Sequence, residues 1–188
     1  SVAYRGIFIN DEDWGLNPWS SNNYEPKMRK RNGEDSTPRN GEIGPYTHER
    51  IFELLLRLRA NIFWPAMHEC TVPFYLIKGN REVADKYGIL ISTSHCEPMM
   101  RNTNGEWRKA GLGDYNFVTN AKQVVHFWEE RVKELSGSDC LYTLGMRGVH
   151  DSAMEGAKTI PEQVKVLTDV LKVQRDLLAM HVNAQVDK

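Results

Sequence analysis

The side chains that could carry out chemistry gather in four short segments of this 188-residue chain. Each segment follows an apolar run and holds carboxylates, imidazoles or a guanidinium group. The segments contain Asp11, Glu12, Asp13 and Trp14; His68 and Glu69, with Trp64 just before them; His95, Cys96 and Glu97; and Arg147, His150, Asp151 and Glu155. Positioned carboxyl and imidazole groups act as general acids and bases, and guanidinium binds carboxylates at two points. This pattern favours an enzyme site.

Each of these residues also has a purely structural interpretation. The aspartates of the first segment are common turn formers. His68 and His95 could be buried, hydrogen-bonded imidazoles at strand ends. Arg147 could pair with Asp151 instead of binding a ligand. The tryptophans could stack on sugar rings or cover the mouth of a barrel.

The apolar runs and the helical stripes between them predict alternating strands and helices. Ile51, Leu54, Leu55 and Leu58, for example, share one face of a helix. We expect strands over 5–10, 61–67, 89–94 and 141–146, and helices over 47–58, 80–87, 120–135 and 160–178. The polar stretch over about 17–45 is interpreted as a long loop, and Thr47 as the N-cap of the helix that follows.

Near-continuous apolar strands that alternate with amphipathic helices predict an α/β fold with a parallel sheet. A doubly wound sheet and a barrel both fit, but no strand is followed by GxGxxG or a Walker loop. Four strand–helix units are about half of a TIM-type (β/α)8 barrel, so we expect residues 1–188 to be a single partial barrel domain. A complete four- or five-stranded domain is the alternative. A barrel would bring the four polar segments to one pocket, at the carboxyl ends of its strands.

Composition argues against several functions. The formal net charge is -1, and the basic run at 27–31 is nearly neutralised by Glu25, Glu34 and Asp35, so no nucleic-acid partner is expected. No apolar stretch approaches the length of a membrane span. The three cysteines form neither a disulfide framework nor a CxxC pair. No motif calls for a cofactor or a metal.

Four longer strings resemble one known family. They are Tyr4–Leu16 (YRGIFINDEDWGL), Asn61–His68 (NIFWPAMH), Ser94–Met99 (SHCEPM) and Gly145–Asp151 (GMRGVHD). Each is similar to one of the first four strands in the barrel domain of glycoside hydrolase family 115, the xylan α-glucuronidases. The likeness extends over essentially the whole chain. It implies a large multidomain enzyme that removes glucuronic acid or its 4-O-methyl form from xylan by inversion.

Inverting hydrolysis needs two carboxyl groups about 6.5–9.5 Å apart, one as acid and one as base. Acids from different strands suit that spacing better than neighbours in one loop. The candidates are therefore Asp11 or Glu12, Glu97 and Asp151, with Glu97 as the first choice. The carboxylate of the substrate would be bound by Arg147, His68, His95 and His150, and its sugar rings by Trp14 and Trp64.

Two other functions remain open. His68, His95, Glu97, His150 and Asp151 could hold a metal in a barrel hydrolase or isomerase, although no metal motif is present. Alternatively, the chain could be a non-catalytic carbohydrate-binding piece. With only half of the barrel, we expect glucuronoxylan hydrolysis to be weak or absent and the exposed sheet edges to favour self-association. A polymeric substrate indicates a secreted or periplasmic bacterial protein.

Overall fold

The computed structural model describes residues 2–185, and its four strands form one parallel sheet in sequence order. β1 (Gly6–Phe8) pairs with β2 (Ile62–Trp64), β2 with β3 (Leu90–Ser92), and β3 with β4 (Cys140–Leu141). Right-handed crossovers between sequential neighbours keep the connecting helices on one face, whereas a doubly wound sheet reverses its strand order. The predicted α/β fold, with part of a barrel, is confirmed.

β1, β2 and β3 lie within the predicted runs and are shorter than those runs, whereas β4 begins at Cys140 and shares only Leu141 with the run predicted over 141–146. β1 is a sheet edge among the described residues, and the side chain of Ile7 is 46% exposed there. Gly6 permits the close approach of β1 to β2, since a Cβ at this position would lie 1.9 Å from the carbonyl oxygen of Ile62. The expected exposed edge is therefore present, while self-association through it stays a prediction.

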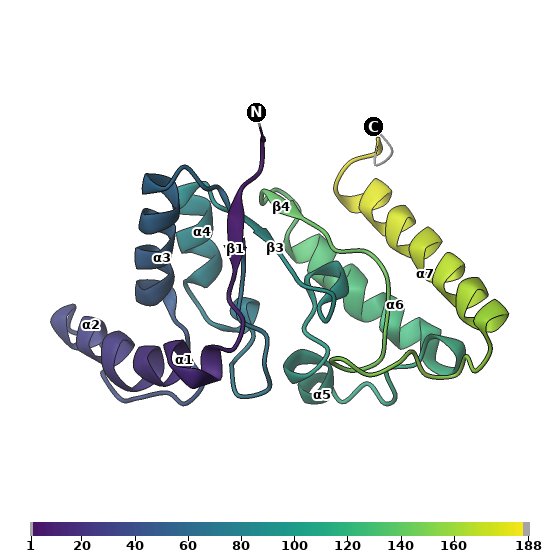
Figure 1. Cartoon of the computed structure of the whole chain (residues 1–188), viewed down its shortest axis with the longest axis horizontal. Coiled ribbons are helices and arrows are strands. Elements are labelled where there is room, and N and C mark those ends of the chain that lie inside the picture. Colours follow the sequence, from purple (N-terminus) through teal and green to yellow (C-terminus); the bar gives the residue numbers. More distant parts are fainter. Residues whose placement is uncertain (1, 186–188) are drawn as a thin grey trace. The chain divides into compact units, whose positions relative to one another are not determined.

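The chain divides into two compact units, each described by itself. The first comprises Ser1–Ser92 and Asp139–Leu141, so it holds the whole sheet. Its crossover helices α3 (Pro45–Arg57) and α4 (Asn80–Tyr87) lie side by side (Figure 1). Phe52 of α3 packs edge-on against Phe63 of β2, with ring centroids 5.2 Å apart, and both are fully buried. A single domain over the chain stays a prediction.

The segment predicted as a long loop is largely helical in its first half. It forms α1 (Leu16–Trp19), a π-helical turn (Ser20–Tyr24) and α2 (Glu25–Arg31). Only the stretch from Asn32 onward is irregular, up to the start of α3. The prediction of a loop from about 17 is therefore wrong as far as Arg31.

The buried face of α2 is polar, which explains why apolar periodicity did not reveal this helix. Glu25 is fully buried and accepts hydrogen bonds from the backbone N–H and the hydroxyl of Thr47, at 2.6 and 2.7 Å. Arg29 forms a buried ion pair with Glu42 at 3.2 Å. Thr47 is thus a partner of Glu25 and not the expected N-cap, since α3 begins at Pro45 after Gly44.

The second unit comprises Thr93–Ser138 and the residues from Tyr142 onward. It contains α5 (Gly105–Ala110), α6 (Phe117–Glu134) and α7 (Ile160–His181). Its core is formed mainly by the facing sides of α6 and α7 with Met99, Trp107 and Tyr115; the helix residues are Val124, Phe127, Trp128, Val132, Val170, Leu177 and Leu178.

The first residues of α6 and α7 can be compared with the helix starts predicted from the sequence. α6 begins three residues before the expected Asn120, because the side chain of Asn116 accepts hydrogen bonds from Val118 and Thr119. Asn120 itself is a kink with φ −136°. α7 begins as predicted, with Thr159 and Glu162 forming a reciprocal capping box.

Short 3-10 turns occur where polar segments leave the strands. They cover Glu12–Trp14, Phe74–Leu76 and Pro98–Met100. None of the helices within residues 2–185 has the length and apolar character needed to cross a bilayer.

Candidate functional site

The candidate residues form two groups, one in each unit. The first group lies after β1 and β2 and contains Asp11, Glu12, Asp13 and His68. The second lies in the loops after β3 and β4 and contains His95, Cys96, Arg147, His150 and Asp151. In each group, residues from two polar segments that follow neighbouring strands lie together. That all four segments line one pocket stays a prediction.

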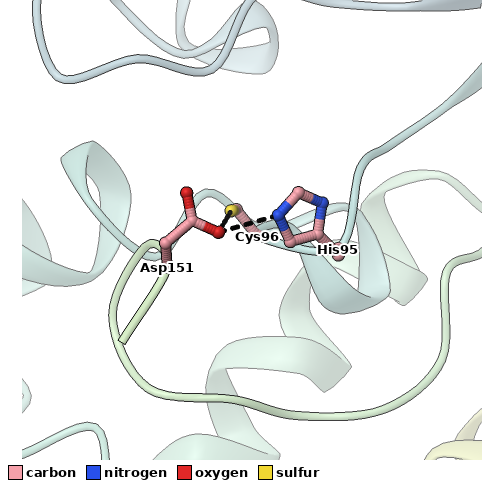
Figure 2. Close-up of side chains that lie close together, drawn as sticks. All are labelled: His95, Cys96 and Asp151. Atoms are coloured by element: carbon pink, nitrogen blue, oxygen red, sulfur yellow. Dashed lines mark hydrogen bonds and ion pairs between the residues drawn. The ribbon is translucent and has the colours of Figure 1, made fainter. Parts of the chain in front are cut away.

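Asp151 is the centre of the second group. Its Oδ1 accepts a hydrogen bond from Nε2 of His95 at 2.9 Å and lies 3.0 Å from Nη1 of Arg147. Its Oδ2 lies 3.3 Å from Nδ1 of His150. Figure 2 shows the imidazole of His95 and the thiol of Cys96 converging on the same carboxylate oxygen. The side chain of Asp151 is still 57% exposed, so a ligand could reach it.

The surroundings keep Asp151 ionised. The hydrogen bond from His95 is the largest influence lowering its pKa, and the charges of His150 and Arg147 lower the pKa further. Cys96 shows the opposite effect, because burial, assisted by the negative charge of Asp151, raises the pKa of its thiol to about 11. At neutral pH the pair is thus a carboxylate beside a neutral thiol.

A buried hydroxyl holds the two loops of this group together. Thr103 donates its hydroxyl hydrogen to the carbonyl oxygen of Cys96 at 3.0 Å and accepts the N–H of His150 at 3.1 Å. Its side chain is buried. One residue therefore fixes the backbone beside His95 relative to the backbone beside Asp151.

The loop after β4 is also fixed to α7. Gln174 of α7 is fully buried, and its side-chain amide bonds both the N–H and the carbonyl oxygen of Gly145, at 2.7 and 2.8 Å. A Cβ at Gly148 would lie 2.2 Å from Oγ of Ser152 and 2.4 Å from the carbonyl oxygen of Ala153. Only glycine fits at this close turn, which brings Asp151 toward His95.

His150 has a left-handed backbone conformation with φ +53°. Such a conformation costs roughly 1–3 kcal/mol for a residue other than glycine. Asp11 in the first group is left-handed as well, with φ +57°. Strained positions of this kind concentrate at functional sites, and these two residues each belong to one of the two groups.

Glu97, the first choice from the sequence, has a different environment. It is only 5% exposed, and its Oε1 accepts a hydrogen bond from the side chain of Asn102 at 3.1 Å. Its backbone carbonyl accepts from the hydroxyl of Thr93 at 2.6 Å. These contacts suit a residue that supports the loop more than one that touches substrate, and a catalytic role for Glu97 stays a prediction.

Glu12 is the centre of the first group and is 1% exposed. Its Oε1 accepts hydrogen bonds from the backbone N–H of His68 at 2.8 Å and from the hydroxyl of Thr71 at 3.0 Å. Asn17 completes the network by donating to Thr71 at 2.7 Å. Glu12 therefore joins the loop after β1 to the loop after β2.

His68 lies over this buried acid. Its Nδ1 donates to Oδ1 of Asp13 at 3.0 Å and is 3.6 Å from Oε2 of Glu12. The side chain of His68 is 23% exposed and that of Asp13 is 42% exposed. The first and second segments therefore lie together, whereas binding of a substrate carboxylate by His68 stays a prediction.

All three tryptophans near the first segments are at least partly exposed, and two of them contact another aromatic ring. Trp14 is 86% exposed and Trp64 is 37% exposed. Trp64 also meets Phe8 edge-on, with ring centroids 5.5 Å apart. Trp19 stacks on Tyr24 at 4.7 Å and is partly engaged. Sugar binding by Trp14 and Trp64 is compatible with this exposure and stays a prediction.

Both groups contain metal-ligating atom types at close range. One ligand atom from each of His95, Cys96 and Asp151 lies within 4.8 Å of the others, and the same holds for Asp11, Asp13 and His68. A metal in the second group would have to displace the proton of a thiol whose pKa is about 11. The first group contains no cysteine, so a metal there would not have to displace a thiol proton.

Several supporting residues were not identified from the sequence. Thr71, Asn102 and Thr103 act through hydrogen bonds to segments distant in sequence, for which a single sequence carries no signal. Gln174 is the one of these supporting residues for which the sequence does carry a signal. It interrupts the apolar stripe of α7, and a polar side chain at a core position must find a buried hydrogen-bond partner.

Comparisons with known proteins agree on one family. The family model described as glycosyl hydrolase family 115 matches residues 1–188. A solved structure described as a family GH115 4-O-methyl-α-glucuronidase with specificity for decorated arabinogalactans is 61% identical, with a TM-score of 0.91. That likeness covers 99% of this chain and 23% of the solved chain, so this chain spans about a quarter of its length. None of the curated proteins matches.

Proposed function

This chain belongs to glycosyl hydrolase family 115, and we propose that it supplies part of the active site of a glycosidase that removes glucuronic acid, or its 4-O-methyl form, from xylan. The proposal rests on the family and on a relative at 61% identity that is described as a 4-O-methyl-α-glucuronidase. We assign roles in this reaction to residues of the second group, where the exposed acid Asp151 is surrounded by nitrogen donors.

The observation that carries the proposal is the ionised, accessible carboxylate of Asp151. An inverting reaction needs a carboxylate that removes a proton from the attacking water. Asp151 is exposed, and the hydrogen bond from His95 holds its pKa below the ordinary value. A group that stays deprotonated suits the base better than the acid, because the acid must still carry its proton at the working pH.

The second carboxyl would stand about 6.5–9.5 Å from the first in an inverting site. Asp11 and Glu12 are candidates from the sequence, but Glu12 is buried within the first group. Since this chain spans 23% of the related chain, the acid could also come from the remainder of such an enzyme. We therefore propose that the 188-residue chain alone does not turn over glucuronoxylan.

Arg147 is assigned a positioning role in this scheme. Its Nη1 lies 3.0 Å from Oδ1 of Asp151, and its Nη2 donates to the backbone carbonyl of the same residue at 2.7 Å. These donors hold the loop and its carboxylate. The imidazoles of His95 and His150, which are partly exposed, are then the nearer candidates to bind the carboxylate of the sugar.

The two lines of support name different polymers as the carrier of the uronic acid. The resemblance noted in the sequence implies xylan, while the solved relative is described as specific for decorated arabinogalactans. We propose that the uronic acid is the group released, whichever of the two polymers carries it. Polymers of this size favour a secreted or periplasmic enzyme.

The experiment compares the 188-residue chain with a longer form that spans a complete barrel. Both are incubated with glucuronoxylan and with a glucuronic acid-decorated arabinogalactan, and released uronic acid is quantified. Release from xylan by the longer form alone supports the proposal. Release from arabinogalactan only would correct the polymer, and release from neither would overturn the proposed activity. Turnover by the short chain would contradict its proposed inactivity.

A further inference from the structure

We propose that the first group of candidate residues is a binding site for a divalent transition metal, with Zn²⁺ as the best fit. The proposed ligands are a carboxylate oxygen from each of Asp11, Glu12 and Asp13, and Nδ1 of His68. The site joins the loops that follow β1 and β2 in the first unit. It does not depend on the proposed glycosidase activity, and its test uses metal binding alone.

The distances from Nδ1 of His68 to two of the acids match those between ligands that share one ion. Nδ1 of His68 lies 3.0 Å from Oδ1 of Asp13 and 3.6 Å from Oε2 of Glu12. Zn²⁺ binds nitrogen and oxygen at about 2.0–2.2 Å, which separates neighbouring ligand atoms by roughly 3–3.6 Å. A carboxylate oxygen of Asp11 is within 4.8 Å of the ligand atoms of Asp13 and His68.

The second observation is a buried oxygen that lacks a hydrogen-bond partner. Glu12 is 1% exposed, and the N–H of His68 and the hydroxyl of Thr71 both donate to its Oε1. Within the part of the chain that is described, Oε2 accepts no hydrogen bond. Leaving a carboxylate oxygen buried without a partner is costly, and a cation beside Nδ1 of His68 would remove that cost.

The charge of the group points the same way. Three acids lie consecutively, and in the described structure neither Asp11, Glu12 nor Asp13 forms an ion pair with a lysine or arginine. The ion pairs that they do form all involve His68. A divalent ion would neutralise carboxylates that otherwise repel one another.

The ligand types select among metals. An imidazole nitrogen favours zinc, copper, nickel or iron over calcium and magnesium, which prefer sites made only of oxygen. The buried network also fixes the geometry in advance, since Asn17 bonds Thr71 and Thr71 bonds Glu12. Metals bind more tightly to ligands whose own orientation is held by such bonds.

The test measures Zn²⁺ binding to the full chain after chelation, by isothermal titration calorimetry. We expect one equivalent to bind, and we expect His68→Gln and Asp13→Asn each to weaken binding more than about tenfold. His95→Gln, in the other group, is the matched control and should leave the affinity unchanged. Equal binding by His68→Gln, or loss of binding only in His95→Gln, would overturn the proposal.

Glu12→Gln separates ligation from a purely structural role. The variant keeps an oxygen for His68 and Thr71 but loses the negative charge. Without metal, we expect it to melt at the temperature of the wild type or above. With saturating Zn²⁺, the wild type should gain stability and Glu12→Gln should gain less. An equal gain in both proteins would show that Glu12 is not a ligand and would contradict the proposed ligand set.

Co²⁺ provides a spectroscopic check that does not depend on the variants folding. A complex with nitrogen and oxygen ligands shows only weak visible bands, whereas a thiolate ligand adds an intense charge-transfer band. We expect the weak bands alone. An intense thiolate band would place the metal at Cys96 and overturn the proposed site.

Discussion

Nε2 of His95 lies 2.9 Å from Oδ1 of Asp151, although 56 residues separate them in the chain. The contact joins the loop after β3 to the loop after β4 within one compact unit. It also lowers the pKa of the acid that we assign to proton transfer. The loops, the hydroxyl of Thr103 and the left-handed His150 all hold this pair in place.

Asp151→Asn should abolish most of the uronic acid release by the longer form. Loss of a general base typically lowers the rate about 10²–10⁴-fold, and we expect a fall in kcat of that order. Asn keeps the shape of the side chain and can still accept from His95. Asp169→Asn, on the exposed side of α7, is the matched control and should retain activity. Wild-type rates in Asp151→Asn would remove this residue from the mechanism.

His95→Gln should shift the acid limb of the pH profile of kcat/KM. The hydrogen bond from His95 is the largest influence that lowers the pKa of Asp151. Without the imidazole, the carboxylate becomes protonated at a higher pH, so activity should be lost earlier as the pH falls. The profile should move toward higher pH while the alkaline limb stays in place. An unmoved acid limb would mean that Asp151 is not the group that titrates.

Thr103→Val should destabilise the chain by about 1–3 kcal/mol. The variant preserves shape but leaves the carbonyl of Cys96 and the N–H of His150 without their buried partner. Urea denaturation of both proteins gives the difference. Thr168→Val is the control, because that hydroxyl is on an exposed helix turn and its removal should cost much less. Similar losses in the two variants would argue against a special role for Thr103.

Acid should destabilise the first unit through His48, which is buried against α4. Burial is the main cause that lowers its pKa from 6.5 to about 4, and its Nδ1 bonds to Gly44 and Asn80 only partly offset that effect. Between those pH values the unfolded chain binds a proton that the folded chain does not. The stability is thus fully present above about pH 6.5 and is lost as the pH falls toward 4.

The measurement is the free energy of unfolding at pH 7 and pH 5. His48 should account for a fall of about 2 kcal/mol between these pH values, and His48→Gln should abolish that part. The exposed His126→Gln serves as the control and should show the wild-type fall. If His48→Gln loses as much stability on acidification as the wild type, another group is responsible.

The sequence was sufficient where a local pattern carries its own physical signal. The capping box of Thr159 and Glu162 is contained in four residues, and the left-handed Gly88 ends α4 where predicted. Apolar runs located β1, β2 and β3, because strands buried in a parallel sheet must be apolar, whereas the run at 141–146 overlaps β4 only at Leu141. The same patterns could not reveal α2, whose buried face consists of paired charges such as Arg29 with Glu42.

Residue types alone therefore determined the class of fold, the four polar segments and the family resemblance. Tertiary structure decided which candidate is exposed, since Glu97 is buried beside Asn102 while Asp151 is accessible. Burial and hydrogen bonding depend on partners tens of residues away, such as Thr103 for His150. A carboxylate has the same chemistry anywhere in a sequence, and only its neighbours in space set its charge and its access to substrate.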